Sequence, residues 1–342
     1  MRRSVYDIVL KQKKYAGPAV LALAMFGLGF AGGWFFGVKA NRAVPPFQEQ
    51  RLGGYAFINP LLECDAARDS LAAGELHPFK YRIEQAIEKL KGGSVNVSHI
   101  SAYFRDMNNG LSFGIGASEK FTPASLVKVP LMMAYFKAAE NDPGLLSRTI
   151  PYGGGPDQNA GQAFKPAVAI EPGRSYTVDD LIRAAIIYSD NNAYFLLFRS
   201  LDPRVQKRVY SDLGLEIPKV RTRDDYMTVN EYAAFFRILF NASYLTRDLS
   251  EKALKLLSEV EFTAGLKAGV PPNIAVAHKF GQRSLGDGQI KQLHDCGIVY
   301  YPDHPYLLCV MSRGASFEYL DDAIREISRI TFDAVDGQYR GK

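Results

Sequence analysis

The apolar pattern of this chain changes its period twice, and this change restricts the fold more than any other feature. Apolar and polar residues alternate at 95–106 and 111–117, as in strands, and Asn108-Asn-Gly110 between them is typical of a hairpin turn. Between about 125 and 260 the apolar residues recur at helical spacing instead. Strand-like stretches then return at 274–279, 289–301 and 305–312.

Amphipathic helical patterns at 78–90 and 317–335 lie outside these strands at either end. Strands at both ends of one domain, separated by a helical block, are most simply joined in a single antiparallel sheet. The sequence therefore predicts an α+β fold at 77–338, with an antiparallel five-stranded sheet, flanking helices and an inserted all-helical subdomain at about 125–260. We expect a cleft between the sheet and the inserted helices.

The N-terminal part has the pattern of a membrane anchor. Gly17 to Val38 are 22 residues without a charge, enough to cross a bilayer as a helix, and five basic residues precede them. By the positive-inside rule we predict a cytoplasmic basic segment at 1–15, a transmembrane signal anchor at 16–38, and a stalk and docked segment at 39–76 on the outer side. A cleaved signal peptide is the alternative, but the charged leader and the apolar run are both long for one.

Charge outside this anchor is balanced. The chain has 41 Lys and Arg against 36 Asp and Glu, and residues 1–39 hold six of the bases and one of the acids, which leaves 35 of each elsewhere. A neutral body argues against a nucleic-acid partner. The histidines show no metal-ligand spacing, so we expect neither a metal nor a cofactor.

Three cysteines, Cys64, Cys296 and Cys309, follow the anchor. An odd number leaves at least one thiol unpaired within the chain. Cys296 and Cys309 fall on two strands joined by the turn at 302–304, which makes them neighbours without making them face each other. The sequence leaves two possibilities open. Either two of the three cysteines form a disulfide, which could include Cys64, or all three are free and buried.

The stretch Phe121-Thr-Pro-Ala-Ser125-Leu-Val-Lys128 carries the first chemical signal. A serine three residues before a lysine, in the first turn of a helix, places both side chains on one face. A lysine shielded from water can have its pKa lowered enough to take the proton of the serine hydroxyl. Taken alone, Ser125 could equally be a helix cap and Lys128 a solvated surface residue.

Two further motifs follow in order. Ser189-Asp190-Asn191 joins two predicted helices, 61 residues after Lys128, and His278-Lys279-Phe280-Gly281 ends the first of the three C-terminal strands. Ser-x-x-Lys, Ser-Asp-Asn and Lys-Thr-Gly in this order are the signature of class A serine β-lactamases and penicillin-binding proteins. The chain resembles that superfamily, and class A most, across roughly residues 77–335.

The resemblance implies a catalytic role for three residues. Ser125 attacks an amide carbonyl to form an acyl-enzyme, Lys128 serves as its base or proton relay, and Ser189 passes a proton to the departing nitrogen.

The resemblance also implies a substrate-binding set. Asn191 would hold the side-chain amide of the substrate, and Lys279 would attract a carboxylate and keep Lys128 neutral. Gly281 lies in the same strand, and the backbone N–H groups of Ser125 and Gln282 would bind the oxyanion. We expect His278 to pack beside the motif.

Two departures from the family pattern affect these expectations. Phe280 replaces a hydroxyl residue that helps to bind the substrate carboxylate, at a cost of about 1.5–3 kcal/mol for a lost charge-assisted hydrogen bond. Ser284, Arg283 or Arg313 could compensate.

The second departure concerns release of the acyl group. The loop glutamate that activates the deacylating water has no evident counterpart, and Glu216 is the only acid in the shortened loop that we nominate. Without a positioned base, deacylation would slow by about 10²–10⁴-fold.

The expected function is a bacterial membrane-anchored serine hydrolase, single-pass, with its catalytic domain outside the cytoplasm. It would form an acyl-enzyme at Ser125 with β-lactams or peptidoglycan stem peptides that end in D-alanine, and contact the lipid bilayer through 16–38. The alternative is a cell-wall-associated binding or structural module that keeps the fold without turnover. A covalent penicillin adduct would distinguish the two.

Overall fold

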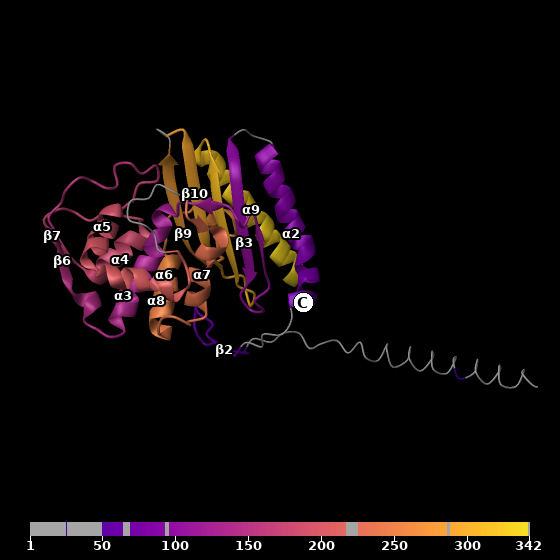
Figure 1. The fold of residues 1–342 in the computed structure, drawn as a ribbon, viewed down its shortest axis with the longest axis horizontal. Helices are drawn as coiled ribbons and strands as arrows, with labels where there is room; N and C mark the ends of the chain where they lie inside the picture. The colour runs from indigo at the N-terminus through magenta and orange to yellow at the C-terminus, as the bar shows by residue number, and fades with distance from the viewer. Residues whose placement is uncertain are drawn as a thin grey trace, which may run out of the picture. The chain divides into compact units, whose positions relative to one another are not determined.

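A five-stranded antiparallel sheet built from both ends of the domain forms the centre of the fold, as predicted (Figure 1). Its strand order is β4-β3-β11-β10-β9, with β9 at an edge. The strands are β3 (Val97–Asp106), β4 (Ser112–Ile115), β9 (Val276–Leu285), β10 (Ile290–Val299) and β11 (Tyr306–Gly314). Each neighbouring pair is antiparallel.

The structure is a computed structural model, which describes Met25 and residues 50–63, 69–92, 96–216, 225–285 and 288–340. Apart from Met25, these residues lie in one compact unit, 48–342. The predicted anchor at 16–38 lies outside the described residues, except for Met25. Among the residues that are described, no helix is both long and apolar enough to cross a membrane.

Two long helices, α2 (Asp69–Gly92) and α9 (Phe317–Tyr339), cover one face of the sheet and lie side by side (Figure 1). The apolar residues of α9 recur at three- and four-residue spacing, so that one stripe of the helix is buried against the strands. The stripe consists of Leu320, Ala323, Ile324 and Ile327, all without exposed surface.

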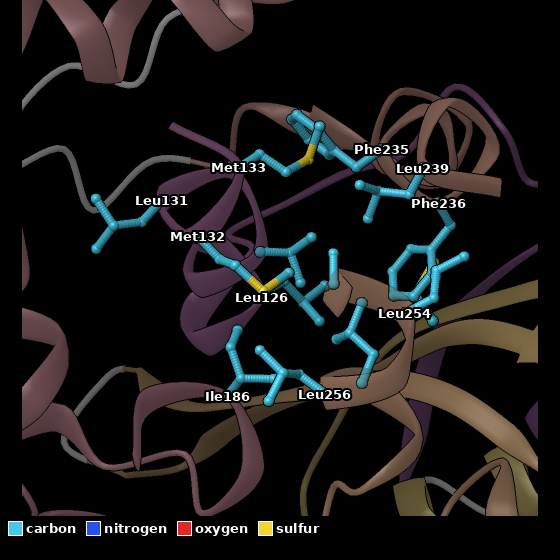
Figure 2. Packing of buried hydrophobic residues seen from close by; sticks show 14 of the residues in the cluster. Leu126, Leu131, Met132, Met133, Ile186, Phe235, Phe236, Leu239, Leu254 and Leu256 are labelled. Carbon is cyan, nitrogen blue, oxygen red and sulfur yellow. The ribbon is translucent and has the colours of Figure 1, made fainter. Parts of the chain in front are cut away.

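The helical subdomain covers the other face and contains the larger apolar core. Figure 2 shows Leu126, Ile186, Phe235 and Leu254 from four separate elements converging in it. The helices are α3 (Lys128–Ala139), α4 (Val178–Ile187), α5 (Asn191–Ser200), α6 (Pro203–Asp212), α7 (Val229–Phe240) and α8 (Arg247–Ser258).

This subdomain is not purely helical. A two-stranded pair, β6 (Thr149–Tyr152) with β7 (Arg174–Thr177), projects from it, and β5 (Lys120–Phe121) pairs with β8 (Met227–Thr228). These strands have two to four residues each, too few for an alternating pattern to be recognised in the sequence.

Residues 50–63 dock on the domain through backbone and side-chain contacts. The Glu251 carboxylate accepts hydrogen bonds from the N–H groups of Ala56, Phe57 and Ile58, at 2.9–3.1 Å. The strands β1 (Gln50–Arg51) and β2 (Leu61–Glu63) pair beside this contact.

The cysteine question is partly settled. Cys296 and Cys309 stand directly opposite each other on β10 and β11 and form a disulfide. Cys64 lies outside the described residues.

Candidate active site

The nucleophile candidate lies in a tight turn that precedes the helix. Ser125 belongs to the 3-10 turn η1 (Ala124–Val127), and α3 begins only at Lys128, later than the sequence pattern predicted. Ala124 has φ 51°, a conformation that is costly for a residue with a Cβ and that concentrates at functional sites. The turn leaves the Ser125 side chain partly exposed, at the end of an otherwise buried helix.

Lys128 is the central polar group of the site. Its side chain is 2% exposed, and its Nζ lies 3.1 Å from Ser125 Oγ, 3.1 Å from Ser189 Oγ, 2.7 Å from the Ser189 carbonyl oxygen and 2.8 Å from Asn191 Oδ1. The carbonyl and amide oxygens can only accept hydrogen bonds. A neutral amine would satisfy both with its two N–H groups and keep its lone pair for a hydroxyl proton.

Electrostatics favour that neutral amine. Burial lowers the pKa of Lys128 well below its usual value, and the nearby charge of Lys279 lowers it further, whereas Asp190 acts in the opposite direction. Desolvation penalises the charged form of any buried amine. Lys128 is therefore suited to accept a proton.

Lys279 approaches from the sheet. It has no exposed surface, and its Nζ lies 3.0 Å from Ser189 Oγ and 3.2 Å from the Phe280 carbonyl oxygen. Burial lowers the pKa of Lys279 to about 7, against an opposing effect of the Asp295 charge. The Ser189 hydroxyl thus lies between two lysine amines, and the three motifs meet as predicted.

Gly281 brings β9 against the serine turn. A Cβ added there would lie 2.6 Å from the Pro123 carbonyl oxygen, closer than real side chains allow, and 3.1 Å from the Leu126 side chain, which is a tight contact. The missing side chain therefore lets the strand edge reach η1. Gln282 follows on β9, so its backbone N–H remains the predicted second oxyanion donor.

Both ends of the Asn191 amide are already bound within the protein. Its Oδ1 accepts from Lys128, and its Nδ2 donates to the Gln158 carbonyl oxygen at 3.0 Å. The backbone N–H of Asn191 donates to Asn159 Oδ1 at 2.7 Å. Asn191 thus orients Lys128, in addition to its predicted role toward substrate.

The nominated deacylation base lies in a different setting. The Glu216 carboxylate is 3.5 Å from the Lys120 amine, and both side chains are about half exposed. Of the hydrogen bonds in the described part of the chain, none joins a carboxylate to Ser125 or Lys128. Asp224 and the rest of 217–224 lie outside that part.

Two of the polar residues that could compensate for Phe280, Ser284 and Arg313, already have partners within the protein. Ser284 Oγ accepts from Lys291 at 3.1 Å, and Arg313 is held by two carboxylates, Glu119 and Asp225. The Phe280 ring stacks on Phe262 with centroids 4.1 Å apart. Two stacked aromatic rings therefore occupy the position where the resemblance led us to expect a hydroxyl group.

His278 packs beside the motif, as expected. Its Nδ1 lies 2.9 Å from Asp295, and both side chains are buried. Within the described ranges, no group of three or more His, Cys, Asp and Glu side chains could hold a metal ion.

The segment at 157–164 contributes polar contacts to the site that sequence reasoning missed. Gln162 Nε2 lies 3.4 Å from the Ser189 carbonyl oxygen, and the Gln282 side chain binds the backbone of Ala163 and Phe164. This stretch has neither helical nor strand periodicity, so only its amide-rich composition could have drawn attention to it.

Comparison with solved structures shows the same fold. PBP-A matches with a TM-score of 0.64 and 20% identity over 77% of this chain and 97% of its own. A β-lactamase from Xanthomonas campestris matches with 0.61 and 21% over 74% and 97%, and one from Chitinophaga pinensis with 0.63 and 18% over 74% and 99%.

No curated protein matches the chain significantly. The model of the β-lactamase enzyme family, however, matches residues 82–335, which contain all three motifs and most of the described domain. The chain belongs to the β-lactamase enzyme family, whose serine hydrolase fold it shares.

Proposed function

We propose that this protein is a membrane-anchored, extracytoplasmic serine hydrolase that forms an acyl-enzyme at Ser125 with β-lactams or D-alanyl peptides. One observation carries the proposal: the buried amine of Lys128 lies 3.1 Å from both Ser125 Oγ and Ser189 Oγ. A nucleophile within hydrogen-bond reach of a base, itself oriented by a third group, is the arrangement that covalent catalysis requires. The anchor at 16–38 and the bacterial membrane location rest on the sequence pattern.

In the first step, the Ser125 oxygen attacks the amide carbonyl while its proton passes to Lys128 Nζ. The backbone N–H groups of Ser125 and Gln282 take the oxyanion charge. Ser189 then donates its proton to the departing nitrogen and is reprotonated by Lys128. As the C–N bond breaks, the acyl group remains on Ser125 and Lys128 returns to its neutral form.

Hydrolysis of the acyl-enzyme has less support from the residues of this site than its formation has. Glu216 pairs with Lys120, and the carboxylates of Asp190 and Asp225 accept hydrogen bonds from other protein groups. A water near Ser125 would therefore lack a dedicated base among the described residues. A variant of PBP-A is an acyl-enzyme complex with penicillin G, and we propose the same adduct here.

The test is intact-mass measurement after incubation with a fluorescent penicillin. We expect one adduct on the wild type and none on Ser125→Ala. Folded wild type without an adduct would contradict the proposal. Fractionation tests the anchor: full-length protein should stay with membranes through an alkaline wash, and release by that wash would contradict anchoring.

The second candidate function is a cell-wall-associated module without turnover. The contact of the 157–164 segment with the Gln282 side chain favours it, because the strand that carries Lys279 and the predicted oxyanion donor is already bound there by another part of the chain. Wall binding by folded protein, unchanged in Ser125→Ala and without an adduct in either, would establish this candidate instead.

A further inference from the structure

The ten-residue segment 160–169 is flanked by two residues that both donate hydrogen bonds to the carboxylate of Asp190, in the Ser189-Asp190-Asn191 motif. The residue before it, Asn159, donates from Nδ2 to Asp190 Oδ1 at 2.8 Å, and the residue after it, Ile170, donates from its backbone N–H to Asp190 Oδ2 at 2.8 Å. Asp190 has no exposed surface. Both ends of segment 160–169 are therefore anchored to the same buried carboxylate, and neither anchor involves the middle of the segment.

The middle of this segment reaches the substrate-binding strand. Gln282 Oε1 accepts from the N–H groups of Ala163 and Phe164 at 3.0 and 3.1 Å, and Gln282 Nε2 donates to the Phe164 carbonyl oxygen at 2.9 Å. The carboxamide of Gln282 thus binds both polar groups of the Phe164 main chain. A ligand amide could make the same pair of contacts.

The Phe164 ring lies in an aromatic pocket. Its centroid is 5.1 Å from that of Phe262, 5.8 Å from Phe317 and 6.1 Å from Phe280, each in an edge-on arrangement. Such contacts add about 0.5–1.5 kcal/mol per pair to the burial of the rings. The three rings therefore form an apolar surface that accommodates the ring of Phe164.

Few other contacts hold the segment in place. Seven of its ten residues are exposed and most of these are small: Ala160, Gly161, Ala163, Lys165, Ala167, Val168 and Ala169. Gln162 adds a bond of 2.8 Å from its Nε2 to Asn159 Oδ1, inside the anchored end. The Gln282 amide contact and the Phe164 ring hold the segment against β9, together with two longer hydrogen bonds of 3.4 Å, from Gln162 Nε2 to the Ser189 carbonyl oxygen and from Gln282 Nε2 to Gln162 Oε1.

This pocket adjoins the catalytic lysines. The Phe280 ring centroid is 4.1 Å from Lys279 Nζ, which is itself 3.0 Å from Ser189 Oγ. We propose that the pocket formed by Phe262, Phe280 and Phe317 is a substrate subsite for an amide bearing an apolar ring, and that Phe164 fills it in the free protein. Segment 160–169 is then a lid that lifts when such a ligand binds. Its place in catalysis rests on the proposed function.

A binding experiment tests the subsite without any catalysis. The probe is N-acetyl-L-phenylalaninamide, which reproduces the amide and ring of Phe164, titrated by NMR into wild type, Phe164→Ala and the control Phe57→Ala. Phe57 is also partly buried and contacts Tyr300 through its ring. We expect Phe164→Ala to bind the probe at least tenfold more tightly than either other protein. Equal affinity in all three would overturn the subsite.

Hydrogen exchange tests the lid. Gln282→Ala removes the amide contact but keeps the backbone N–H, and it should raise exchange in 160–169 while leaving Asn159 and Ile170 protected. Phe164→Leu, whose side chain is smaller than the ring, supplies the binding test if Phe164→Ala does not fold. Unchanged exchange in Gln282→Ala would overturn the lid.

Acylation separates this inference from the proposed function. If the lid competes with substrate, Phe164→Ala should be acylated by benzylpenicillin at least fivefold faster than wild type at low concentration, and the probe should slow that reaction. Probe binding by Phe164→Ala with no adduct on any protein would refute the proposed function and keep the subsite. If adducts form but Phe164→Ala is acylated no faster than wild type and the probe does not slow acylation, the subsite is refuted and the proposed function is kept.

Discussion

Two lysine amines flank one serine hydroxyl, and they cannot both carry a charge at low cost. Lys128 and Lys279 are both buried, and both lie within 3.1 Å of Ser189 Oγ. Two like charges in a low-dielectric site repel each other, so each lowers the other's affinity for a proton. Burial and the nearby charge of Lys279 lower the pKa of Lys128 well below its usual value, so we take Lys128 as the neutral member and Lys279 as the one that carries charge below its pKa of about 7.

Lys128→Met should remove the base while keeping the fold. We expect acylation by a fluorescent penicillin to fall by about 10²–10⁴-fold, the usual contribution of a positioned base. The thermal midpoint should be measured alongside, because the substitution removes a buried amine but also leaves the Ser189 carbonyl oxygen and Asn191 Oδ1 without that donor. Lys137→Met, on the same helix α3 but bound to the Tyr244 carbonyl oxygen, is the control and should react like wild type. Near-normal acylation of Lys128→Met would contradict the assignment.

The charge of Lys279 predicts a pH dependence. As the pH rises through about 7, Lys279 loses its proton and with it the positive charge that we propose attracts the substrate carboxylate. The acylation rate should therefore fall on the alkaline side, with a midpoint near that value. Lys279→Arg stays charged throughout this range and should flatten the alkaline limb, whatever its absolute rate. An unchanged midpoint in the arginine variant would assign the titration to another group.

At the scale of elements, catalysis depends on how closely β9 approaches η1. Gly281→Ala would place a Cβ 2.6 Å from the Pro123 carbonyl oxygen, so strand and turn must separate. Such overpacking costs about 1–3 kcal/mol, and we expect acylation to fall at least tenfold, because small displacements spoil a reacting geometry. Gly153→Ala, with nothing within 4 Å of its added Cβ, is the control. Equal rates in the two variants, measured with unfolding curves, would contradict this account.

The docked segment at 50–63 depends on one carboxylate. Glu251 accepts backbone hydrogen bonds from Ala56, Phe57 and Ile58, and Glu251→Ala would leave them without that acceptor. We expect the free energy of unfolding to fall by about 1.5–3 kcal/mol, the usual contribution of hydrogen bonds to a charged group.

Glu259→Ala is the matched control for this change, because it removes a carboxylate of the same helical region that pairs with Arg183 at a partly exposed site. A pair of that kind contributes about 0–1 kcal/mol. Urea unfolding of both variants provides the comparison. Equal losses would show that docking does not depend on Glu251.

At the scale of the whole molecule, the features that could be predicted from the sequence are those with a local pattern, such as alternating strands, turn residues and short motifs. Alternation and turn residues identified all five strands of the sheet, although β9 continues to Leu285, beyond its predicted end at 279, so that the Lys279 motif lies inside the strand. The motif order indicated that Ser125, Lys128, Ser189 and Lys279 share one site, and their contacts bring them together. The resemblance supplied the roles, which the contacts alone do not test.

Other features depended on distant contacts that carry no local signal. The 3-10 turn at Ser125 follows from the packing of β9 against it, and the path of 160–169 follows from hydrogen bonds to Asp190 and Gln282. Phe280 was recognised as a departure, but its stacking on Phe262 could not be predicted, because the two residues are distant in the sequence and have no common pattern.

The relative rates of acylation and deacylation depend on the whole site. Acylation needs a base for a serine that is already in place, whereas deacylation needs a second base for water on the other side of the acyl group. In the proposed mechanism the first base is Lys128, whose Nζ lies 3.1 Å from Ser125 Oγ, whereas the Glu216 carboxylate lies 3.5 Å from the Lys120 amine. Nitrocefin should therefore give a burst equal to the enzyme concentration, followed by turnover about 10²–10⁴-fold slower than the burst.

Slow deacylation also determines how long the penicillin adduct lasts. A penicillin adduct, isolated from excess ligand and followed by intact mass, should persist through that slow phase and decay at the steady-state rate. Glu216→Gln should leave burst and decay unchanged, because its carboxylate takes no part in either. If nitrocefin turned over many times at the burst rate, or if Glu216→Gln slowed only the decay, a carboxylate would have to reach the acyl group, and the division of labour argued here would be wrong.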